Sequence, residues 1–169
     1  MTAGNRFTVI SAANRRRLVA ALFYFHVACR VKREGKIPGE FLAEALLNFH
    51  KVLEVLYGPD RVTVRTSLKD LGYTSDEIER DYIPSMLLRD QMDVGHPMLA
   101  VLTPRQLDTL HRYADRAERV FRDLLQRLFQ AIEAGSFDVP AHGAHQVDPA
   151  VNRTLEMLRR NFSQLPDSP

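Results

Sequence analysis

The chain of 169 residues has a single cysteine, a net charge of only +2 and no apolar run long enough to cross a bilayer. A lone cysteine, Cys29, excludes an internal disulfide and is typical of a reducing compartment such as the cytoplasm. The small net charge excludes nucleic-acid binding through overall charge, so any such surface has to be local. The longest apolar segment, 18–29, follows three arginines, but it is too short to span a membrane and lacks a cleavage site of small residues. We therefore expect a soluble, cytoplasmic protein without membrane contact.

Several chemical motifs are also missing. The eight glycines form no phosphate-cradling loop, and no nucleophile-elbow pattern occurs, so ATP-driven chemistry and serine hydrolysis are not expected. His142 and His145 have a spacing that could bind a metal ion, but no cysteine or carboxylate cluster completes a site. We interpret them as loop histidines, and His26 and His50 as packed or edge histidines of the first two helices. No metal and no cofactor are expected.

Helical periodicity dominates the chain, and no segment alternates as a strand does. Two long helices joined by a short link containing Gly35, Pro38 and Gly39 should form an antiparallel hairpin. Pro84 should kink or split a later helix that carries the motif described below. We predict helices over about 13–33, 40–57, 64–71, 74–89 and 103–134, and a short one after residue 150.

Two of these helices begin with recognisable capping residues. Thr74 with Glu77, and Thr103 with Gln106, have the spacing of a capping box, and Pro104 suits the first turn. The sequence therefore predicts an all-α bundle of about four to six helices in a single domain, 1–169. Its core should span about 13–134, and 136–169 should form a loop and a short C-terminal helix.

The most informative segment is RDQMDVGHP, residues 89–97, in which six residues separate Arg89 from His96 at the end of an apolar helix. On a continuous helix the two side chains would share a face about 10 Å apart. Gly95 lets the backbone turn back, which would bring them closer, and Asp90 is near enough to orient the imidazole. Taken alone, an arginine at a helix C-terminus and a histidine in a turn are also ordinary structural residues.

An arginine beside a histidine suits cleavage of a phosphodiester. RNA cleavage needs a base for the 2′-OH, a group that stabilises the negative charge on the phosphorane and an acid for the leaving 5′-oxygen. Histidine serves as base or acid near neutral pH, and the arginine fork matches phosphate oxygens. One histidine cannot be both acid and base in the same step, whereas a two-fold dimer would bring two copies of His96 and Arg89 together. The chemistry predicts a homodimer with this segment at its interface.

The order of an arginine, a polar residue and a histidine, followed by a long amphipathic helix, resembles the HEPN superfamily of α-helical domains. The signature of that superfamily is an arginine, four to six residues and a histidine, often with Asn, Asp or His directly after the arginine, where this chain has Asp90. The segment 41–58 is similar to a helix of such domains with an apolar run around a Leu-Glu pair, here Leu53 and Glu54. The resemblance covers about 13–134.

The resemblance implies a metal-independent endoribonuclease of the toxin–antitoxin or antiviral-defence type, acting on RNA as a dimer with a composite site. It implies that Arg89 and His96 are the catalytic pair, that Asp90 is their polar partner, and that an antitoxin or nucleotidyltransferase accompanies the protein. Some relatives carry a modifiable tyrosine two residues after the histidine; Met98 stands there, so that regulation is not expected. Many members are instead inactive helical modules for dimerisation or for partner or nucleic-acid binding. That alternative remains open, as does a monomeric adaptor.

Basic residues elsewhere are further candidates for RNA contacts. Arg15, Arg16 and Arg17 form one cluster, and Arg112 and Arg116 belong to a basic stripe on the helix at 103–134. The alternative for the cluster is a set of charges at the mouth of a buried helix. The alternative for the stripe is a solvated face, because four acidic residues precede arginines at i,i+4 spacing. These pairs are Asp108–Arg112, Asp115–Arg119, Glu118–Arg122 and Asp123–Arg127.

Overall fold

The structure, a computed structural model, describes residues 12–34, 40–89, 102–135, 153–154 and 156–159, with the side chains of 12–15 left aside. Within these ranges every regular element is helical and no strand occurs, so the prediction of an all-α bundle is confirmed. None of the helices in the described ranges combines the length and apolar content needed to cross a bilayer.

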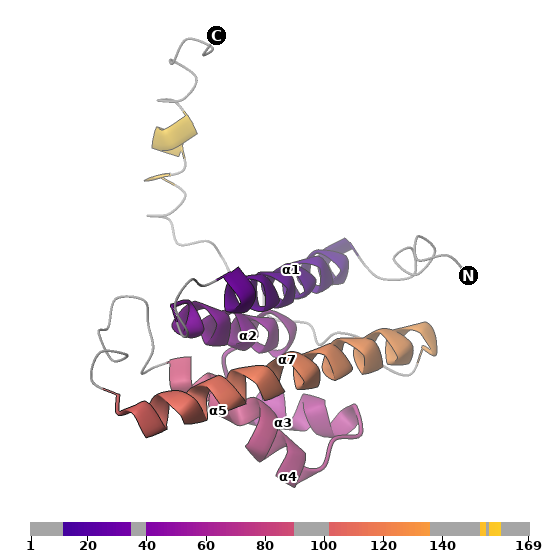
Figure 1. The fold of residues 1–169 in the computed structure, drawn as a ribbon. Coiled ribbons are helices and arrows are strands. Elements are labelled where there is room, and N and C mark those ends of the chain that lie inside the picture. The colour runs from indigo at the N-terminus through magenta and orange to yellow at the C-terminus, as the bar shows by residue number, and fades with distance from the viewer. Residues whose placement is uncertain (1–11, 35–39, 90–101, 136–152, 155, 160–169) are drawn as a thin grey trace.

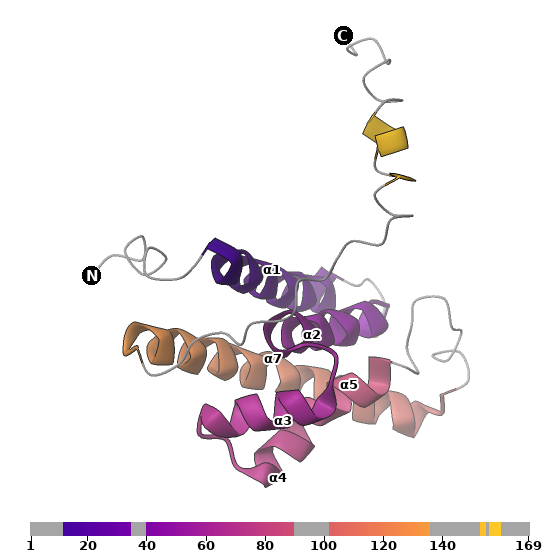
Figure 2. The same cartoon turned by 180° about the vertical axis from the view of Figure 1, so that it is seen from behind.

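Figures 1 and 2 show the arrangement from opposite sides, with α2 between α1 above it and the helices α3 to α5 below. α2 contacts α1, α3, α5 and α7, and so lies at the centre of the bundle. Residues 153–154 and 156–159 are also helical. The elements are α1 (Ala12–Glu34), α2 (Leu42–Tyr57), α3 (Arg61–Asp70), α4 (Ser75–Glu77), the π-helical turn η2 (Ile78–Tyr82), α5 (Ile83–Arg89) and α7 (Pro104–Glu133).

The first two helices form the predicted antiparallel hairpin. Arg17, near the start of α1, donates from Nε to the Val55 carbonyl at 2.9 Å and also donates to the Leu56 carbonyl. Both carbonyls belong to the last turn of α2, where carbonyl groups lack a partner within the helix. The beginning of α1 therefore lies beside the end of α2, and the Arg17 cation complements the negative end of the α2 dipole.

The core is built around aromatic rings of three elements. Phe121 of α7 lies 5.2 Å from the ring of Phe49 in α2 and 5.5 Å from the ring of Tyr82 in η2, measured between centroids. All three residues are fully buried. The contacts between these rings join the long helix α7 to the centre of the bundle and to the π-helical turn.

The two helices with a predicted capping box begin where the sequence predicts, whereas α3 begins at Arg61 instead of about residue 64, and the region of Pro84 differs from a simple kink. Both capping boxes form, at Thr74 with Glu77 and at Thr103 with Gln106. Pro84 has no N–H to donate to the carbonyl of Arg80, and the Ile83 N–H bonds to the Ile78 carbonyl, five residues back. The result is a π-helical turn that ends at Tyr82, two residues before Pro84.

Candidate functional site

Of the three predicted catalytic residues, the structure describes one. Arg89 is the last residue of α5, while Asp90 and His96 lie outside the described residues. The side chain of Arg89 is 42% exposed. Its position depends on α5 packing against α2, which brings the end of the motif helix to the middle of the central helix.

The Arg89 guanidinium meets two polar side chains of α2. Its Nη1 lies 3.2 Å from Nε2 of His50 and 3.4 Å from Oε1 of Glu54, and His50 Nε2 lies 3.4 Å from Glu54 Oε2. The His50 side chain is 2% exposed and the Glu54 side chain 34%. The three side chains therefore form a layered cluster, with the imidazole inside, the carboxylate at the boundary and the guanidinium reaching solvent.

The cluster constrains the hydrogen-bonding role of His50. A guanidinium only donates, so a bond from Arg89 to Nε2 requires this nitrogen to accept, with the ring proton on Nδ1. A proton on Nε2 would instead point to Glu54, across the longer of the two distances. The contact from Arg89 is a hydrogen bond only in the tautomer that carries its proton on Nδ1. His50 and Glu54 then both hold the guanidinium in one orientation, as a phosphate-binding arginine requires.

His50 and Glu54 were not singled out as site residues from the sequence, which suggested only a packed or edge histidine. The available signal is their i,i+4 spacing on an otherwise apolar helix, because such residues share a face. That face turns towards the end of α5, where it meets Arg89. Which helix packs on that face depends on tertiary structure, and periodicity alone does not give it.

The three arginines of the predicted RNA-binding cluster at the start of α1 have different environments. Arg17 is engaged with the carbonyls that end α2. Arg16 is exposed, and the side chain of Arg15 lies outside what the structure describes. Arg16 is therefore the described member of the cluster whose side chain faces solvent.

On α7, three of the four expected i,i+4 pairs form: Asp108–Arg112 at 2.8 Å, Glu118–Arg122 at 3.1 Å and Asp123–Arg127 at 2.9 Å. The fourth does not, because Asp115 pairs with Lys32 of α1 at 2.9 Å. Exposed pairs such as Asp108–Arg112 contribute little to stability. Arg112 therefore lies in a solvated pair, whereas Arg116 reaches across to η2.

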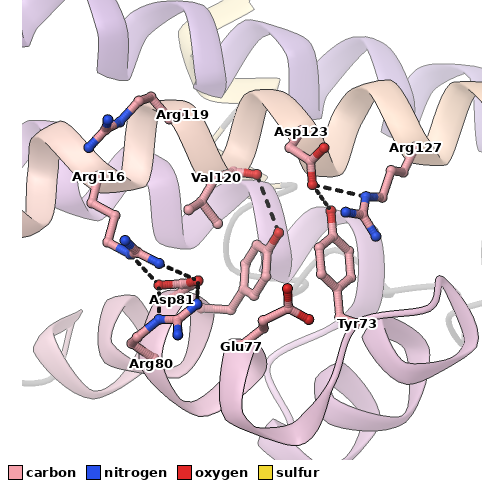
Figure 3. Close-up of a pocket in the computed structure, with 10 residues that line it drawn as sticks. Tyr73, Glu77, Arg80, Asp81, Arg116, Arg119, Val120, Asp123 and Arg127 are labelled. Atoms are coloured by element: carbon pink, nitrogen blue, oxygen red, sulfur yellow. Dashed lines mark hydrogen bonds and ion pairs between the residues drawn. The ribbon is translucent and has the colours of Figure 1, made fainter.

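Arg116 lines a pocket of about 280 Å³ between α7 and the segment running from Tyr73 through η2 (Figure 3). Arg116 and Arg80 approach the carboxylate of Asp81 from two sides. Each donates from both Nε and Nη2, so that each oxygen of Asp81 accepts from both guanidinium groups. At the other end, the Tyr73 hydroxyl donates to Asp123 Oδ2 at 2.8 Å.

Electrostatics fix the protonation of these groups. Burial of Asp81 acts to raise its pKa, but the hydrogen bonds and charges of Arg116 and Arg80 outweigh burial, and the pKa is lowered from its ordinary value. Burial raises the pKa of Tyr73, and the pKa of Tyr82 is raised by burial and by the neighbouring Tyr73. The carboxylate is therefore charged and the phenols are neutral at physiological pH.

No group of three or more His, Cys, Asp or Glu residues within the described ranges is arranged to hold a metal ion. Comparison with known proteins found no matching family model, no matching curated protein and no matching solved structure. The geometry of the Arg89 cluster and of the pocket is therefore what bears on function.

Proposed function

We propose that this chain is a HEPN-like, metal-independent endoribonuclease of the toxin or antiviral-defence type, acting as a homodimer with a composite active site. Arg89 and His96 would be its catalytic pair, with Asp90 as their polar partner. RNA is the proposed substrate, and an antitoxin or a nucleotidyltransferase is the proposed accompanying protein.

The observation that carries the proposal is the placement of Arg89 beside Glu54. These residues come from the two separate segments on which the HEPN resemblance rests, 89–97 and 41–58, and their side chains approach to 3.4 Å. Arg89 is oriented by Glu54 and His50, yet it keeps 42% of its side chain exposed. An oriented and accessible guanidinium supports a role in stabilising negative charge on a phosphorane.

The remaining chemistry falls to residues that follow Arg89 in the chain. In the proposed reaction one His96 removes the proton of the 2′-OH, and His96 of a second copy protonates the leaving 5′-oxygen. Arg89 stabilises the charge that develops on the phosphate between them. Because proton transfer by the imidazoles and charge stabilisation by the guanidinium complete the step, it needs no metal ion.

One observation favours a second candidate, a catalytically inactive helical module for dimerisation or partner binding. His50 is buried, and Arg89 and Glu54 supply polar contacts to it. A buried imidazole needs such contacts irrespective of catalysis, so Arg89 could serve the fold alone. On that candidate, Arg89→Ala would lower stability or association, and no RNA would be cut.

The test is cleavage of total and synthetic RNA by the purified full chain in EDTA. His96→Ala and Arg89→Ala should each lower the cleavage rate by about 100-fold or more, since general acid–base groups and charge-stabilising groups each contribute that much. His26→Ala is the matched control, because His26 lies exposed on α1 away from the cluster. It should cut at the rate of the unmodified protein.

Melting temperatures of the same variants separate the two candidates. The ribonuclease proposal requires His96→Ala to have the melting temperature of the unmodified protein and to lose the cleavage activity. Intact RNA with every variant, or equal cleavage by His96→Ala and the unmodified protein, would overturn it. Sedimentation of the unmodified protein should give a dimer, and a monomer that still cuts RNA would contradict the composite site.

A further inference from the structure

The pocket beside η2 carries an excess of positive charge at one end. Asp81 is a single carboxylate held between two guanidinium groups, those of Arg80 and Arg116. One negative charge thus faces two positive charges, and the side chains of Arg80 and Arg116 remain 57% and 43% exposed. Asp81 therefore orients both arginines, but its single negative charge balances only one of their two positive charges.

Both arginines also keep one edge available. Each uses Nε and Nη2 on Asp81, and among the described residues neither Nη1 makes a hydrogen bond. The two guanidinium groups are fixed by the same carboxylate, so the directions of their remaining N–H groups are fixed as well. Pre-oriented N–H donors of this kind bind anions at a low cost in side-chain entropy.

Arg119 adds a third cation on the same side. It projects from α7 one turn beyond Arg116, on the side of the pocket away from Tyr73 (Figure 3). Within the described part of the chain it makes no hydrogen bond or ion pair, because Asp115, its expected i,i+4 partner, is bound to Lys32. Its charge is therefore not balanced by a neighbouring carboxylate.

The opposite end of the pocket carries no excess of positive charge, because Arg127 faces the carboxylates of Asp123 and Glu77. Arg127 pairs with Asp123 at 2.9 Å and lies over the Tyr73 ring, and Tyr73 donates to the same carboxylate. Glu77 accepts hydrogen bonds from the backbone and hydroxyl of Thr74 within the capping box. The positive end of the pocket is therefore the one with Arg80, Arg116 and Arg119, where Glu77 and Asp76 also act electrostatically on Arg80.

We propose that this end of the pocket binds the phosphate monoester group of a small molecule, through Nη1 of Arg80 and Arg116 and the guanidinium of Arg119. A monoester dianion matches the local excess of charge, and arginine forks match phosphate oxygens. A pocket of about 280 Å³ suits a small ligand. Tyr73 and Tyr82 are buried and offer no exposed ring for stacking, so the phosphate itself is the recognised group. The wall of the pocket is a π-helical turn, a feature frequent at functional sites.

This site is separate from the Arg89 cluster and does not depend on RNA cleavage. The full chain is titrated with inorganic phosphate, with AMP and with a short DNA oligonucleotide that lacks terminal phosphates, and binding is followed by calorimetry and by the rise in melting temperature. We expect AMP and inorganic phosphate to bind, and the oligonucleotide to bind more weakly than AMP. Arg119→Ala should weaken AMP binding by roughly tenfold, as expected for loss of a hydrogen bond to a charged group.

The matched control is Arg105→Ala, which removes the same charge from an exposed position on α7 outside the pocket. It should leave AMP affinity unchanged. Because Arg119 has no partner among the described residues, Arg119→Ala without ligand should have the same melting temperature as the unmodified protein. Absence of AMP binding at 10 mM, as an order-of-magnitude ceiling for weak sites, would overturn the proposal. Equal weakening by the two variants, or tighter binding of the oligonucleotide than of AMP, would also overturn it.

Discussion

At the scale of single residues, Asp81 shows how one carboxylate connects two elements. Its side chain is 6% exposed and accepts from Arg80 in its own turn and from Arg116 in α7. Asp81→Asn keeps the shape but removes the charge that both guanidinium groups face. We expect it to lower the free energy of unfolding by about 2 kcal/mol at neutral pH, and the melting temperature by about 5 °C.

The pH dependence of that loss identifies its cause. The pKa of Asp81 is lowered in the folded protein, so its stabilising contribution is present above the unfolded pKa of about 3.9 and is lost as the pH falls through the folded pKa. The difference between Asp81→Asn and the unmodified protein should therefore shrink as the pH is lowered below about 4. Asp108→Asn, in the exposed pair with Arg112, should change the melting temperature little at any pH. A difference for Asp81→Asn that is constant from neutral to acid pH would contradict the ionic explanation.

At the scale of elements, α7 depends on its first turn. Thr103 accepts from the Gln106 N–H, and the Gln106 side chain accepts from the Thr103 N–H. Thr103→Ala removes half of this capping box and should cost about 1 kcal/mol, or a few degrees of melting temperature. Thr109→Ala is the matched control, because Thr109 is exposed inside α7 and its hydroxyl donates to the Arg105 carbonyl. Since alanine has the higher helix propensity, this control should be neutral or stabilising, and equal losses in both variants would contradict the capping role.

Capping and periodicity are local, which is why the sequence predicts the elements well. Thr74 and Thr103 start their helices where the spacing of their capping residues places them. The π-helical turn is different. Pro84 predicts a disturbance, but whether the chain bends, breaks or widens by one residue depends on what the shifted residues meet. Here the widened turn sets Asp81 between Arg80 and Arg116, and the partner on α7 is 35 residues away.

At the scale of the whole molecule, both candidate sites are made by packing between distant segments. Arg89 meets His50 across 39 residues, and Arg116 meets Asp81 across 35. The sequence predicts Arg89 as a site residue from its local motif, and predicts Arg116 only as part of a basic stripe. It predicts neither partner, because a helical face gives its direction relative to its own axis and not the identity of the helix that covers it. The all-α fold was predictable, whereas the contacts that define the sites were not.

The integrity of the bundle should depend on the aromatic contacts at its centre. Phe121 is fully buried against Phe49 and Tyr82, whereas Phe23 on α1 is 60% exposed. Phe121→Ala should lower the free energy of unfolding by about 3–5 kcal/mol, because it removes buried apolar area and leaves a cavity. That is a large part of the total stability of roughly 5–15 kcal/mol of such a domain.

Phe23→Ala makes the same chemical change at the surface and should stay within about 0.5 kcal/mol of the unmodified protein. Urea unfolding followed by circular dichroism measures both variants, with the midpoint falling strongly for Phe121→Ala alone. Similar midpoints for the two variants would mean that α7 does not pack on α2 and η2 through Phe121. In that case the pocket, whose walls belong to α7 and η2, would lose its structural basis as well, because the same packing holds Arg116 opposite Asp81.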